Sequence, residues 1–194
     1  MKKIVTFLLL VMLVPTMVTA QEVTSETLEE TLKKEKIEYN LENYKEEEGK
    51  VPVYLFRGQG CSHCHEFLEF VASDLIKEYG TYFNLVSYEV WNNSNNASLM
   101  QEISEYLEDD ASGVPYIIIG DKTFNGYAES MDKEIKEAIK KLYDSDDRYD
   151  VFKEMKEHPK EKKTSKTNST TTIVFIIFAS IAVIALVVTG IKKK

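Results

Sequence analysis

The chain has 194 residues, and its 32 acidic residues against 24 basic ones give a formal net charge of −8. An acidic chain is repelled by phosphate backbones, so we expect no nucleic acid among its partners. It has only two cysteines, too few for the disulfide scaffold of a small exported protein. Without the strongly apolar segments at its two ends, the chain has the length of one domain of ordinary size.

Both ends have the composition of segments that meet a membrane. Residues 1–20 combine a basic start, an apolar run and small residues before Gln21, which predicts a signal peptide. Residues 173–191 form an unbroken run of apolar and small residues, long enough to cross a ~30 Å hydrocarbon core. The lysines at 192–194 should hold that end in the cytoplasm. We therefore expect a single-pass protein of the cell membrane whose middle lies outside the cytoplasm, on a bacterial surface or, as second choice, in the endoplasmic reticulum lumen.

Between these ends the composition changes three times. Residues 21–35 are charged and helix-prone, and we expect a peripheral helix or a loose leader. Residues 36–157 contain the apolar periodicity of a folded domain, which should start with a strand over 36–41 and a short helix over 41–48. Residues 158–172 are rich in Lys, Ser and Thr and predict a flexible stalk.

The middle of the domain alternates strands with helices. Val51–Phe56 is a β-branched and aromatic run, which predicts a buried strand. The three-and-four spacing of apolar residues predicts a helix over 62–79, and a second interior strand follows over 83–90. A helix between two such strands implies a parallel pair. Further along, helices are predicted over 97–107, 130–143 and 151–157, and a hairpin of strands at 116–119 and 123–124.

The two cysteines lie in Cys61-Ser62-His63-Cys64, between the first buried strand and its helix. Exposed N–H groups and the helix dipole favour negative charge at a helix N-terminus. We therefore expect the pKa of the Cys61 thiol to be depressed and its thiolate to be nucleophilic near neutral pH. Two cysteines this close together are poorly placed to hold a fold together, so their use should be chemical.

This order of elements, with a CxxC opening a helix and Gly113-Val114-Pro115 entering a hairpin, resembles the thioredoxin superfamily over about residues 36–143. The resemblance implies an α/β domain with a central mixed sheet flanked by helices, and a thiol–disulfide oxidoreductase that needs no cofactor. It also implies that Pro115 is a cis-proline beside the disulfide and that the backbone of Val114 pairs with an extended substrate. Cys61 would react with the substrate, and Cys64 would resolve the mixed disulfide.

His63 separates the cysteines, and a cationic imidazole there would favour the Cys61 thiolate. Because stabilising the reduced form makes a disulfide more oxidising, the centre looks like the disulfide-forming members of the superfamily. Its partners would be exported proteins with thiols or disulfides and an unidentified membrane or extracytoplasmic redox protein. One departure is Leu55, which stands where thioredoxins usually have a buried acid. Trp91, at the end of the second strand, either lines the site or packs.

Three alternatives use the same residues. Cys61-Ser62-His63-Cys64-His65 matches the C-x-x-C-H attachment motif of c-type haem, with His65 and either Met100 or Met131 as axial ligands. The strands around the motif argue against a helical cytochrome. A zinc site would have Cys61 and Cys64 but only the distant His158 besides. A non-enzymatic thioredoxin-like accessory of an export or assembly machine would not need an intact cysteine pair.

Overall fold

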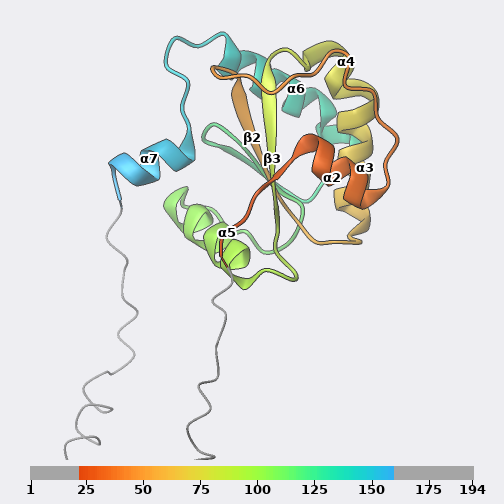
Figure 1. Ribbon diagram of the computed structural model, residues 1–194. Coiled ribbons are helices and arrows are strands. Elements are labelled where there is room, and N and C mark those ends of the chain that lie inside the picture. Colours follow the sequence, from red (N-terminus) through yellow and green to blue (C-terminus); the bar gives the residue numbers. More distant parts are fainter. Residues whose placement is uncertain (1–21, 160–194) are drawn as a thin grey trace, which may run out of the picture. The chain divides into compact units, whose positions relative to one another are not determined.

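The computed structural model describes residues 22–159 as one α/β domain with a five-stranded mixed sheet, in the order β1-β3-β2-β4-β5 (Figure 1). The strands are β1 (Glu26–Thr27), β2 (Val51–Arg57), β3 (Phe83–Glu89), β4 (Tyr116–Ile119) and β5 (Lys122–Asn125). The helices are α2 (Leu28–Glu35), α3 (Ser62–Phe70), the π-helical η2 (Val71–Leu75), α4 (Ile76–Tyr79), α5 (Ser94–Tyr106), the 3-10 turn η3 (Glu129–Met131), α6 (Asp132–Tyr143) and α7 (Val151–Glu157).

Within residues 22–159, no helix is both long enough and apolar enough to cross a membrane. The signal peptide predicted at 1–20, the span predicted at 173–191 and the tail at 192–194 lie outside the described residues. So does most of the stalk predicted at 158–172.

The central strand is β2, which pairs parallel with β3 along its whole length, from Val51 opposite Phe83 to Arg57 opposite Glu89. On its other side β2 pairs antiparallel with β4, which turns back into β5. These pairings confirm the predicted parallel pair and the predicted hairpin. They also bring the end of β2 and the start of β4 to the same edge of the sheet, because antiparallel neighbours run in opposite directions.

The alternation of side chains along β2 gives the domain two cores. Val53 and Leu55 are fully buried on the face that is covered by α2, α3, α4 and α6. Tyr54 and Phe56 point to the other face, where α5 and α7 pack. Figure 1 shows α5 on one side of the sheet and α2, α3 and α4 on the other. Helices on both faces explain why β2 is apolar at successive positions rather than at every second one.

The helix predicted over 62–79 is confirmed as one continuous helical segment, α3 to α4, with the π-helical turn η2 inside it. It ends at Gly80, where an added Cβ atom would lie 2.4 Å from the carbonyl oxygen of Asn43. Glycine at this position therefore allows the segment before β2 to cross directly over the end of the helix.

The N-terminal predictions need correction. Residues 26–35 form β1 and α2, and Leu28 and Leu32 of α2 are fully buried in the first core. The Thr27–Glu30 capping box starts the helix. The fold therefore begins before residue 36, where the sequence placed the start of the domain, and α2 is not a peripheral helix.

The strand predicted over 36–41 and the helix predicted over 41–48 are both wrong: this segment has neither. It lies along β3 through side chains instead. The hydroxyl oxygen of Tyr44 accepts the backbone N–H of Leu85 at 3.0 Å, and the Asn84 amide donates to the carbonyl of Glu47 at 2.8 Å. These bonds replace the ladder of a strand.

Two other boundaries differ slightly. Helix α5 begins at Ser94 rather than 97, because the Asn93 side chain accepts the N–H groups of Asn95 and Asn96 and caps the helix there. The helix predicted over 130–143 opens with the 3-10 turn η3 before α6. The helix predicted over 151–157 is confirmed.

Candidate active site

The cysteines lie where β2 turns into α3. After Arg57 the chain passes through Gly58, Gln59 and Gly60, and the positive φ of Gly60 (80°) is a conformation that glycine adopts without strain. Cys61 is the N-cap residue of α3, and its backbone N–H donates to the carbonyl of Gly58 at 3.1 Å. The tight loop therefore places Cys61 at the helix N-terminus, as the sequence predicts.

Cys61 and Cys64 are joined in a disulfide, with their Cα atoms 5.2 Å apart. Cys61 is 8% exposed and Cys64 only 1%, so the sulfur that a partner reaches first belongs to Cys61. The backbone N–H of Cys64 lies 3.2 Å from Cys61 Sγ and points to it. When the bond opens, this N–H and the other free N–H groups of the first turn stabilise negative charge on the Cys61 sulfur.

The Val114–Pro115 segment reaches the disulfide from the neighbouring strand. Tyr116, the first residue of β4, pairs with Phe56 near the end of β2. The Val114–Pro115 peptide bond is cis, and the carbonyl oxygen of Val114 lies 3.7 Å from Cys61 Sγ. The structure thus brings the Val114-Pro115 turn to the Cys61–Cys64 pair, although Val114 follows Cys61 by 53 positions in the chain. Pairing of Val114 with a substrate stays a prediction.

His63 lies on the exposed side of the first turn of α3. Its Nδ1 atom is 3.0 Å from the carboxylate of Glu66, and the Nε2 atom of His65 is 3.5 Å from that of Glu69. The carboxylate of Glu66 orients the His63 ring, a partner that the sequence reasoning did not consider. The influence of His63 on the Cys61 thiolate stays a prediction.

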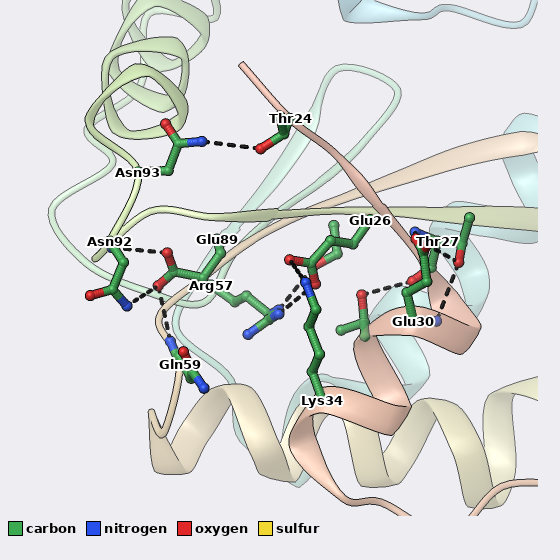
Figure 2. A network of polar contacts seen from close by, with 12 residues as sticks. Thr24, Glu26, Thr27, Glu30, Lys34, Arg57, Gln59, Glu89, Asn92 and Asn93 are labelled. Atoms are coloured by element: carbon green, nitrogen blue, oxygen red, sulfur yellow. Dashed lines mark hydrogen bonds and ion pairs between the residues drawn. The ribbon is translucent and has the colours of Figure 1, made fainter. Parts of the chain in front are cut away.

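Behind the disulfide, the fold contains a buried ion-pair cluster that the sequence analysis missed. Leu55 is fully buried, and two residues further on Arg57 is only 1% exposed. Its guanidinium donates to Glu26 at 2.6 Å, to Glu35, and to the hydroxyl of Ser87 at 3.1 Å. Figure 2 shows Arg57 and Glu26 pointing toward each other, with Lys34 beside them. A buried charge needs such partners, and here both carboxylates come from the N-terminal segment.

The electrostatics of Glu26 reflect this position. Partial burial of the carboxylate would raise the pKa of Glu26, but the hydrogen bonds from Lys34 and Arg57 outweigh that effect, and the pKa lies below its usual value of 4.5. Glu26 is therefore held in its charged form at neutral pH, opposite the guanidinium.

Glu89, the last residue of β3, links the loop before Cys61 to the loop after β3. One oxygen of its carboxylate accepts the backbone N–H of Gln59 at 3.2 Å and that of Trp91 at 3.0 Å. The other oxygen accepts the N–H of Asn92 at 2.9 Å. Figure 2 shows Glu89 between Gln59 and Asn92. We call this set of bonds the Glu89 clamp; it involves backbone donors, which no sequence pattern reveals.

Trp91 lies on the outer surface beside this clamp. A Cβ atom at Gly58 would be 2.2 Å from the Trp91 ring, so the indole rests directly on the backbone of Gly58. The ring nevertheless remains 60% exposed. Of the two expectations for Trp91, the structure shows packing, on the backbone of Gly58; that the indole also lines the site stays a prediction.

The structure gives the alternatives little support. Among residues 22–159, no three His, Cys, Asp or Glu side chains are grouped so that they could hold a metal ion, and zinc gains no third ligand there. For a haem, Met100 packs in the second core, on the far side of the sheet from α3, so it cannot face His65. Met131 packs against the first core. The mixed sheet is also unlike a helical cytochrome.

Comparisons of the chain with models of protein families, with curated proteins and with solved structures found no match. The description of the site consequently depends on its geometry. A mixed sheet with flanking helices and a Cys61–Cys64 pair at a helix N-terminus fits a thioredoxin-like fold and is compatible with thiol–disulfide chemistry.

Proposed function

We propose that this chain is a membrane-anchored, extracytoplasmic thiol–disulfide oxidoreductase of thioredoxin-like fold. It exchanges disulfides with exported proteins through Cys61 and Cys64. One observation carries the proposal: the outer sulfur of the disulfide lies at the N-cap of α3 and 3.7 Å from the Val114 carbonyl, in the turn that contains the cis-proline.

In the oxidising direction a substrate thiolate attacks Cys61 Sγ. A bond forms between the substrate sulfur and Cys61, the Cys61–Cys64 bond breaks, and Cys64 leaves as a thiolate that takes up a proton. A second substrate thiolate then attacks the substrate sulfur of this mixed disulfide, and Cys61 leaves as a thiolate. Two electrons pass from the substrate to the protein, and a membrane or extracytoplasmic disulfide donor restores the pair.

The helix N-terminus supports the oxidising or isomerising direction over the reducing one. Its N–H groups stabilise the Cys61 thiolate, which exists only in the reduced protein. Stabilising the reduced form raises the reduction potential, so the disulfide becomes a better oxidant. A cationic His63 would act in the same sense. Leu55 has no carboxyl group, so the buried acid that could exchange a proton with Cys64 is missing at this position.

The test is oxidation of a dithiol peptide by the full-length protein, followed by mass spectrometry. We expect one peptide disulfide for each Cys61–Cys64 pair reduced. Cys61→Ser should abolish the reaction. Cys64→Ser has no disulfide of its own, so it is given the peptide in its disulfide form; the Cys61 thiolate attacks that disulfide, one peptide sulfur leaves as a thiolate, and a mixed disulfide through Cys61 should accumulate. If both variants behave alike, or if the wild-type disulfide does not exchange, the chain is a non-enzymatic accessory instead.

A further inference from the structure

Trp91 is unusual for its exposure. Among residues 22–159, only Trp91 (60%) and Val23 (51%) are exposed large hydrophobic side chains. A large aromatic ring left in water at a functional edge commonly marks a contact surface, because aromatic residues provide large contact area with little loss of conformational freedom. Trp91 is also the one tryptophan in the whole sequence.

Two contacts hold Trp91 against the loop that leads to the disulfide. Its ring rests on Gly58, whose carbonyl accepts the N–H of Cys61 at 3.1 Å. Its backbone N–H is fixed by the Glu89 clamp, which also fixes Gln59 in the loop before Cys61. Both contacts fix Trp91 to the loop between β2 and Cys61, the loop that positions the reacting sulfur.

The sheet order places Cys61 between two neighbours. Because β3 and β4 flank β2, Val114 approaches from the β4 side and Trp91 from the β3 side. A substrate segment joined to Cys61 therefore has Val114 on one side and the segment that carries Trp91 on the other. Because successive residues of an extended chain advance about 3.3 to 3.6 Å, the side chains one or two positions from the substrate cysteine are the candidates for contact with the indole.

The surrounding charge restricts which segment fits. Residues 22–159 contain 31 acidic and 15 basic residues, a formal net charge of −16. Carboxylates lie on the segments next to the disulfide and to Trp91: Glu66 on α3 and Glu89 at the end of β3. An acidic substrate segment would be repelled here, whereas a neutral or basic one would not.

We propose that Trp91 is a specificity-determining residue, which contacts an apolar side chain next to the reacting cysteine of a neutral or basic protein segment. This inference rests on the proposed function, and it names the class of substrate. The contact stabilises the bound substrate because it removes two apolar surfaces from water at once, that of the indole and that of the substrate side chain.

The experiment uses the oxidised full-length protein and two dithiol peptides that differ only in having Phe or Ser beside the reacting cysteine. Rates are divided by the rate with dithiothreitol, which measures the disulfide without a peptide contact. For wild type we expect the Phe peptide to react about tenfold faster than the Ser peptide. In Trp91→Ala this ratio should fall below about two, and Trp91→Phe should restore most of it. Val23→Ala, the matched exposed apolar residue, should keep the wild-type ratio.

A second measurement needs no change at Trp91. In Cys64→Ser, the Cys61 thiolate forms a mixed disulfide with each peptide supplied in its disulfide form, and fluorescence is read from the single tryptophan. The Phe peptide should shift the emission to shorter wavelength, and the Ser peptide should not. Equal spectra, or a wild-type protein that reacts with dithiothreitol but treats both peptides alike, would overturn the inference and leave the proposed function standing. No reaction even with dithiothreitol would overturn both.

Discussion

Removing the guanidinium of Arg57 should destabilise the domain strongly. Arg57 is 1% exposed and binds Glu26, Glu35 and Ser87. Arg57→Met keeps the aliphatic stem but removes the cation from Glu35 and leaves Glu26 with Lys34 alone. Breaking a buried ion pair on one side costs about 3–5 kcal/mol. With a urea m-value of about 2 kcal/mol per molar, the unfolding midpoint should fall by roughly 1.5 to 2.5 M.

The assay is urea unfolding of the oxidised protein at pH 7, followed by circular dichroism. Lys33→Met is the matched control, because Lys33 forms an ion pair with Glu29 in which both side chains are exposed. Such pairs contribute little in water, so its midpoint should stay close to that of wild type. If Arg57→Met and Lys33→Met lower the midpoint equally, the buried cluster does not stabilise the fold and the reasoning is refuted.

Three further predictions concern the same region. First, the pKa of Glu26 lies below its usual value of 4.5, so the stability that the Glu26 carboxylate contributes is complete above that pH and is lost as the pH falls through its folded pKa. The difference in urea unfolding midpoint between wild type and Glu26→Gln should therefore become smaller from pH 7 to pH 3. Second, Glu89→Gln weakens the charge-assisted hydrogen bonds of the Glu89 clamp, so hydrogen exchange at the Gln59 and Trp91 amides should accelerate by roughly tenfold or more. Unchanged exchange rates would contradict the claim that the Glu89 clamp holds these two amides. Third, His63→Ala should make the disulfide more reducing in a glutathione titration, and a change within about 10 mV would remove His63 from the explanation.

The middle of the fold could be predicted because its signals are local. The apolar run of β2, the periodicity of the helix after it and the hairpin around Gly120 each lie within one short window. The place of the cysteines at a helix N-terminus follows from the same windows. The contact of Cys61 Sγ with Val114 required a resemblance to a family, since the two residues are more than 50 positions apart.

The segment before β2 could not be predicted for a physical reason. Ile37, Tyr39 and Leu41 alternate as in a strand, yet Ile37 is buried and Tyr39 and Leu41 are partly buried without a backbone ladder. Two side-chain bonds join this segment to β3 instead: the Tyr44 hydroxyl accepts the N–H of Leu85, and the amide of Asn84 on β3 donates to the carbonyl of Glu47. A hydrophobic pattern records which side chains are buried, and it does not record whether backbone or side-chain groups satisfy the neighbouring strand.

The buried cluster connects that N-terminal segment to the site. An arginine at the end of an apolar strand is stable in the core only if carboxylates reach it, and Glu26 and Glu35 reach it because β1 and α2 lie over the end of β3. Arg57 in turn precedes the loop that positions Cys61, and the backbone N–H of Val90 donates to its carbonyl at 2.9 Å. Two of the charged residues at 22–35, Glu26 and Glu35, are therefore explained by the cation that they neutralise. The loop that positions the reactive sulfur follows a strand end held by a segment whose composition alone predicts a leader.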